Sequence, residues 1–154
     1  MTKASEVIKA LKGRTICTAE SCTGGLIGAA LTAVPGSSQA YKGGIVSYWS
    51  EIKHTLLGVD TETLAAFGPV SPQVAEQMAK GARKTLDTDI AVSVTGLAGP
   101  GGDEFGNPVG TVFIGYADEN GAVLKEYHFT GDREAVRRQA VDAALALVLK
   151  NIME

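Results

Sequence analysis

Residues 15–31 read TICTAESCTGGLIGAAL and predict one strand, a glycine turn and one helix in succession. The residues of 14–19 favour a strand, and residues 23–33 carry apolar side chains at helical spacing. Four polar or reactive side chains lie between the two elements: Glu20, Ser21, Cys22 and Thr23. A tight turn needs glycine but not these neighbours, so this junction is the first candidate site.

Strands and helices alternate along the rest of the chain. Strands are predicted at 44–50 and 89–96, followed by a hairpin built from TVFIGYAD and VLKEYHFTG across ENGA. Helices are predicted at 4–12, at 51–58 with Ser50 as a possible cap, at TETLAAFG, after Ser71 and Pro72, and at 132–151. This order predicts an α/β fold: a single domain over 1–154, with three αβα layers and a mixed sheet that includes a late antiparallel hairpin.

Composition excludes several classes of protein. The 154 residues are 45% hydrophobic, with a formal net charge of -3 and pI about 5.4, which argues against a nucleic-acid-binding surface. No apolar run has the length of a membrane span, and the charged, amphipathic N-terminus does not resemble a signal peptide. Two cysteines and two histidines match no zinc pattern, so no metal is expected. We expect a cytoplasmic protein.

Three unusual loops follow predicted strands, at 20–25, 47–54 and 96–109. In open α/β sheets, ligands bind beyond the carboxyl ends of the strands, so we expect these loops to meet. In the first loop, Gly24 and Gly25 would let a ligand approach the free N–H groups at the start of the following helix. That helix start could hold a phosphate or an oxyanion; alternatively, Ser21 or Thr23 simply caps it.

Ser21 is a candidate nucleophile that requires a base. Lys53 could serve if burial and a helix N-terminus lower its pKa, although most lysines are solvated; His54 is a weaker candidate. Cys22 is the rival nucleophile, because a thiol at a helix N-terminus should have a lowered pKa. Cys22 could equally be a small buried apolar residue.

The other two loops and the last helix supply candidate binding groups. Tyr48 could stack on a flat base or belong to the core or an interface, whereas Trp49 is expected to pack. The glycine-rich loop, including Gly96 and Gly99, offers backbone donors without side-chain bulk. The sequence GDREAVRRQAV places Arg133, Arg137 and Arg138 in the first turns of a helix, against its dipole. They could recognise phosphate or carboxylate, or pair with Asp132 and Glu134.

Several motifs together resemble one protein family. These are TAESCTGG, PGSS…Y.GG.V.Y….K…LGV, VS, TG.AGP.GG, PVGTV and F.GDR..VR.QA, which span the chain from about residue 5 to 150. The combination resembles the CinA C-terminal-domain family, whose enzymatic members are nicotinamide mononucleotide (NMN) amidohydrolases. The resemblance implies hydrolysis of the NMN carboxamide to nicotinic acid mononucleotide and ammonia, with no metal or other cofactor. Some family members are catalytically silent, so a nucleotide-binding paralogue is the alternative function.

The resemblance also implies roles for individual residues. The family is described as using a serine–lysine pair, which corresponds here to Ser21 and Lys53, and Tyr48 matches the family tyrosine before the lysine. A small-molecule nucleotide is therefore the expected partner, and neither nucleic acid nor membrane is expected. The residues expected to contact it are Glu20, Thr23, Gly24, Gly25, Tyr48, Gly96, Gly99, Arg137 and Arg138. The exposed arginine helix is compatible with a shared interface, so a homo-oligomer is expected.

Overall fold

The computed structural model describes all residues from 1 to 154 and contains a five-stranded mixed sheet of order β2-β1-β3-β4-β5. The strands are β1 (Ile16–Glu20), β2 (Tyr41–Val46), β3 (Ile90–Gly96), β4 (Thr111–Asp118) and β5 (Gly121–His128). Strand β1 pairs in parallel with β2 and β3, whereas β3–β4 and β4–β5 are antiparallel. The predicted mixed sheet with a late hairpin is confirmed.

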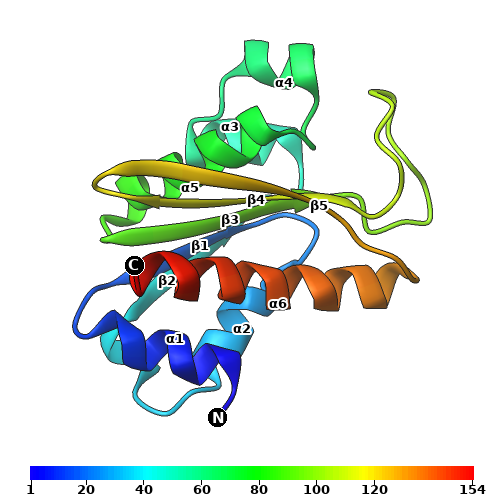
Figure 1. Ribbon diagram of the computed structural model, residues 1–154. Coiled ribbons are helices and arrows are strands. Elements are labelled where there is room, and N and C mark those ends of the chain that lie inside the picture. Colours follow the sequence, from blue (N-terminus) through cyan, green and yellow to red (C-terminus); the bar gives the residue numbers. More distant parts are fainter.

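Helices cover both faces of this sheet (Figure 1). On one face lie α1 (Lys3–Leu11), α2 (Leu26–Thr32) and α6 (Arg133–Ile152). On the other lie α3 (Ser50–Leu57), α4 (Thr61–Phe67) and α5 (Pro72–Leu86), with α5 directly against the sheet. A short 3₁₀ turn, η1 (Ser37–Gln39), precedes β2. The three αβα layers expected from the alternating pattern are confirmed.

The sheet separates two apolar cores. The larger core lies under α1, α2 and α6 and includes Val7, Ile27 and Val148, all fully buried. The smaller core lies under α3 and α5 and includes Leu57 and Met78. Strands β1 and β3 contribute to both cores and are almost entirely buried, as expected for parallel strands covered on both faces.

Several element boundaries differ from those expected. Strand β2 covers Tyr41–Val46 rather than 44–50, so residues 47–49 form a loop beside the end of β1. Trp49, not Ser50, occupies the N-cap position of α3, and no side-chain cap bond forms there. Helix α2 begins at Leu26, after a turn in which Gly24 and Gly25 have φ of 59° and 102°. These left-handed values suit glycine and delay the start of the helix.

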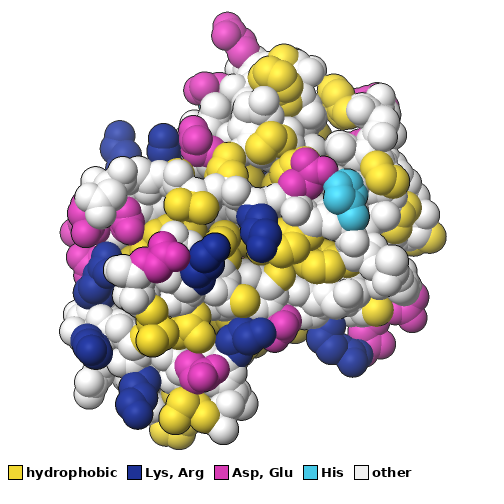
Figure 2. Space-filling view, viewed as in Figure 1, with side chains coloured by type: hydrophobic (Ala, Val, Ile, Leu, Met, Phe, Trp, Pro, Cys, Tyr) yellow, Lys and Arg dark blue, Asp and Glu magenta, His cyan; other side chains and the backbone are white.

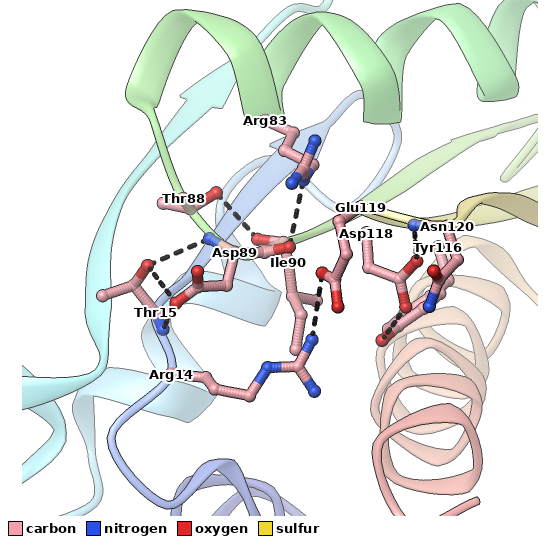
Figure 3. A network of polar contacts seen from close by, with 10 residues as sticks. All are labelled: Arg14, Thr15, Arg83, Thr88, Asp89, Ile90, Tyr116, Asp118, Glu119 and Asn120. Carbon is pink, nitrogen blue, oxygen red and sulfur yellow. Dashed lines mark hydrogen bonds and ion pairs between the residues drawn. The ribbon is translucent and has the colours of Figure 1, made fainter.

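The amino ends of β1 and β3 are joined by a polar network at the edge of the sheet opposite the three candidate loops (Figure 3). The carboxylate of Asp89 accepts hydrogen bonds from the Thr15 backbone N–H at 2.8 Å and from its hydroxyl at 3.2 Å. These hydrogen bonds lower the pKa of Asp89, and the bond from the Thr15 backbone N–H has the larger effect. Arg83 donates to the Asp89 carbonyl from α5, so the network also joins the sheet to a helix.

Acidic and basic side chains are interspersed over the face seen in Figure 2, with apolar side chains between them. No single continuous basic stripe crosses this face, in keeping with the net charge of -3. None of the helices is both long and apolar enough to cross a lipid bilayer.

Candidate active site

The three loops that follow β1, β2 and β3 meet around one cavity of about 210 Å³. Its lining residues are Ser21, Cys22, Tyr48, Lys53, Pro69, Val70, Thr95, Gly96, Leu97, Ala98, Gly99, Gly101 and Arg133. The parallel register of β1 with both neighbours brings the three strand ends to the same edge of the sheet. The expectation that the loops converge is therefore confirmed.

Ser21 and Lys53 contact each other within this cavity. The Lys53 Nζ lies 3.0 Å from the Ser21 Oγ, and the lysine side chain is only 1% exposed. The same Nζ donates to the carbonyls of Ser47 at 2.7 Å and Tyr48 at 3.1 Å. Lys53 lies in the first turns of α3, so the 47–49 loop and the helix together hold its amine against the end of β1.

Burial lowers the pKa of Lys53 from 10.5 to about 8. A neutral amine has two N–H donors and one lone pair. When the two carbonyls accept the two N–H groups, the lone pair is left for the Ser21 hydroxyl. In this state Lys53 is suited to accept the Ser21 proton, which is what a serine nucleophile requires.

The neighbouring thiol of Cys22 has the opposite character. Burial raises its pKa to about 11, although its own backbone N–H and, to a smaller extent, Lys53 and Arg137 lower it in part. The expected lowering by a helix N-terminus is therefore wrong, because desolvation dominates and α2 begins only at Leu26. At neutral pH Cys22 is a protonated thiol and a poor nucleophile.

Glu20 and Thr23 do not line the cavity. The Glu20 carboxylate is buried beneath the turn, where Oε1 accepts from the Thr23 hydroxyl at 2.7 Å and the Ile27 N–H at 2.9 Å. Its Oε2 accepts from the Gly28 N–H at 2.9 Å. The expected contact of Glu20 with substrate is corrected: Glu20 caps α2. The helix N–H groups expected to bind an anion are thus already bonded, and neither Ser21 nor Thr23 is the cap.

The glycines divide between the cavity and the turn. Gly96 and Gly99 line the cavity, whereas Gly24 and Gly25 do not. The Gly24 N–H donates to the Ser21 carbonyl at 3.0 Å, so it is not available to a ligand. Both turn glycines shape the backbone after the nucleophile, which corrects their expected role as substrate contacts.

Two further side chains lie at the mouth of the cavity. Tyr48 is 55% exposed, and its hydroxyl accepts a hydrogen bond of 3.0 Å from Arg133 Nη2. Arg133 Nη1 donates to the Gly99 carbonyl at 2.7 Å, so this arginine joins the second loop to the third. The sequence places Arg133 against the helix dipole with Arg137 and Arg138, but only the other two arginines were expected to contact substrate; the structure instead brings Arg133 to the cavity.

Arg137 and Arg138 do not reach the cavity. Arg137 donates from Nε to the Cys22 carbonyl at 3.0 Å and from Nη2 to the Thr23 carbonyl at 3.3 Å. Arg138 is exposed and pairs with Glu134 one turn away on the same helix. Their expected direct contacts with substrate are corrected, because Arg137 is held by the turn and Arg138 faces solvent.

The remaining candidate side chains lie outside the cavity. Trp49 was expected to pack but is 71% exposed beside Tyr48. His54 contacts the Val59 carbonyl through Nδ1 at 2.8 Å and does not touch Ser21. No group of three or more His, Cys, Asp or Glu side chains is arranged to hold a metal ion.

Comparison with known proteins identifies one family throughout. The model of the CinA C-terminal domain matches residues 1–152. A protein of Enterobacter agglomerans named nicotinamide-nucleotide amidohydrolase PncC is 46% identical over 144 residues, which are 93% of this chain and 88% of that protein. A putative competence-damage inducible protein of Desulforamulus reducens is 48% identical over 135 residues, 88% of this chain but 33% of that protein. This chain spans about one third of the length of several such curated relatives.

Solved structures show the same fold. The competence damage-inducible protein A (ComA) of Klebsiella pneumoniae superposes with a TM-score of 0.96 at 38% identity, covering 99% of this chain and 96% of that one. The competence/damage inducible protein CihA of Agrobacterium tumefaciens gives 0.91 at 39% identity, covering 100% of this chain and 98% of that one.

Proposed function

Because this chain belongs to the CinA C-terminal domain family, we propose that its cavity hydrolyses the carboxamide of NMN to a carboxylate and ammonia. The observation that carries the proposal is the contact between the Ser21 hydroxyl and the buried amine of Lys53. The similarity to the protein named nicotinamide-nucleotide amidohydrolase supports the choice of substrate.

In the proposed reaction, the neutral Lys53 amine takes the Ser21 proton as the Ser21 Oγ attacks the carboxamide carbon. The C–N bond then breaks, and the Lys53 ammonium gives its proton to the departing ammonia. Water attacks the resulting ester while Lys53 takes one of its protons. That proton passes to the Ser21 oxygen as the ester C–O bond breaks, and the released carboxylic acid loses its remaining proton to solvent. One amine thus serves as base and acid in both halves of the reaction.

The size and lining of the cavity support a substrate orientation in which the nicotinamide ring lies inside and the ribose phosphate lies at the mouth. A volume of about 210 Å³ suits the amide-bearing ring and leaves the ribose phosphate at the mouth. Arg133 is the one cationic side chain of the lining besides Lys53, so it is our candidate for attracting the phosphate. Tyr48 bonds to Arg133 and lines the same cavity, so its ring is our candidate contact for the nicotinamide.

The test is ammonia release from NMN by the purified protein, compared with two neighbouring variants. Ser21→Ala removes the nucleophile and should reduce release to background. Cys22→Ala changes the adjacent cavity residue without touching the pair and should retain most of the wild-type rate. Loss of ammonia release in Cys22→Ala together with retained release in Ser21→Ala would instead indicate a cysteine hydrolase.

A well-folded wild type that releases no ammonia would contradict the proposal. A rise in melting temperature with NMN in that case would indicate a nucleotide-binding module without turnover.

A further inference from the structure

Arg137 lies on α6 but bonds to the backbone immediately after Ser21, 115 residues earlier in the chain. Its guanidinium donates to two successive carbonyls, those of Cys22 and Thr23. A planar fork of this kind fixes two acceptors at once, which a lysine ammonium does not do. Arg137 therefore determines the orientation of peptide groups beside the nucleophile without lining the cavity itself.

The N–H groups in the same peptide units bond to no other residue, although that of Cys22 contacts its own thiol. The Ser21 carbonyl accepts from the Gly24 N–H, so the Cys22 N–H, in the same trans peptide, points the opposite way. The Cys22 carbonyl accepts from Arg137, so the Thr23 N–H points away from that guanidinium. Neither N–H donates to any other residue's backbone or side-chain oxygen, and Cys22 lines the cavity.

We propose that Arg137 is a positioning residue that holds the turn after Ser21 so that the N–H group of Cys22, which lines the cavity, stabilises the oxyanion. The inference rests on the proposed function for its substrate, but it concerns the reactivity of Ser21 toward any acylating group.

Gly24 provides a second observation for this arrangement. It has φ of 59°, and a Cβ added there would lie 3.3 Å from the Arg137 Nη2. A hydrogen at this position therefore leaves room for the guanidinium against the turn. Both the left-handed backbone at Gly24 and the position of the Arg137 guanidinium therefore favour the absence of a side chain at residue 24.

The first experiment compares Arg137→Ala with Arg138→Ala, its neighbour on the same helix. Arg138 pairs with Glu134 and touches no part of the turn, so its variant should behave as wild type. Arg137→Ala should lower kcat for ammonia release by about 100-fold with little change in KM, because misplaced donors affect the transition state more than substrate binding. Sub-denaturing guanidinium chloride should restore part of this kcat, whereas sodium chloride of equal ionic strength should not.

Rescue by guanidinium distinguishes positioning from a general structural role. Should Arg137→Ala fail to fold, Arg137→Lys replaces it, and we expect a kcat between that of wild type and background, again at nearly unchanged KM. An unchanged kcat in either folded variant, or a loss confined to KM, would overturn the proposal.

A fluorophosphonate probe separates this proposal from that of NMN hydrolysis. The probe forms an O–P bond with Ser21 and expels fluoride, through a transition state that also carries an oxyanion. Labelling of wild type without ammonia release would contradict NMN hydrolysis, and slower labelling of Arg137→Ala would still support its positioning role. Equal labelling of the two proteins would overturn that role, and unreactive wild-type Ser21 would overturn both.

Discussion

Burial of Lys53 makes its amine reactive at moderate pH. With a pKa of about 8, only a minor fraction of the amine is neutral at pH 7. We predict that kcat/KM for ammonia release rises with pH and levels off above about pH 8. Lys53→Met should abolish acylation at every pH. A flat profile between pH 6 and 9 would remove Lys53 from the role of base.

The same burial affects stability. The folded pKa of Lys53 is about 8 and its ordinary value 10.5, so between these values the unfolded chain binds a proton that the folded chain does not. The free energy of unfolding should therefore rise with pH across this interval, by at most about 3 kcal/mol. Urea titrations at pH 7.5 and 10.5 should show this gain in wild type relative to Lys53→Met. Parallel curves for the two proteins would contradict it.

At the scale of single elements, Glu20 connects the end of β1 to the start of α2. Three donors converge on its buried carboxylate, those of Thr23, Ile27 and Gly28. Glu20→Gln replaces one acceptor oxygen with an NH₂ group facing an N–H, so we predict a loss of about 2 kcal/mol in unfolding free energy. Glu51→Gln, an exposed glutamate in the first turn of α3, is the matched control and should change stability little. Equal effects of both variants would argue against a special role for Glu20.

Substitution of Asp89 should change the stability of the fold without changing the cavity that holds Ser21 and Lys53. Asp89 joins the amino ends of β1 and β3 (Figure 3), whereas Ser21 follows the carboxyl end of β1. Asp89→Ala should cost about 1 kcal/mol at pH 7 and leave kcat unchanged. Because the folded pKa is lowered, this contribution is present above the ordinary value of 3.8 and is lost as pH falls below it. Denaturation at pH 7 and pH 3, with kcat measured in parallel, checks both statements.

The sequence predicts elements better than it predicts contacts. Apolar periodicity indicated the strands and helices, although β2 and α2 have other boundaries than expected, and Ser71 caps α5 as its position before Pro72 suggested. The pairing of Ser21 with Lys53 could not be chosen from residue chemistry alone, because burial of one lysine depends on the whole β2–α3 loop. The contact of Arg133 with Tyr48 and those of Arg137 with the turn after Ser21 cross more than eighty residues of chain, so only the fold reveals them.

At the scale of the whole molecule, the position of Lys53 depends on how α3 packs on α5. Gly81 of α5 lies against the Leu57 carbonyl, at the end of the helix that carries Lys53. A Cβ at position 81 would lie 1.8 Å from that carbonyl oxygen, so the two helices must separate to admit it. The backbone at this contact is closely packed, and a displacement of α3 is transmitted to the lysine amine.

We therefore predict that Gly81→Ala lowers both stability and activity, although it lies outside the cavity. A displacement of roughly 1 Å between Lys53 and Ser21 corresponds to about a 100-fold loss of kcat. Lys80→Ala is the matched control, since its exposed ion pair with Glu76 on the same helix contributes little. The melting temperature and kcat should both fall in Gly81→Ala. Neither should fall in Lys80→Ala. A folded Gly81→Ala with wild-type kcat would mean that α3 tolerates the shift without moving its lysine.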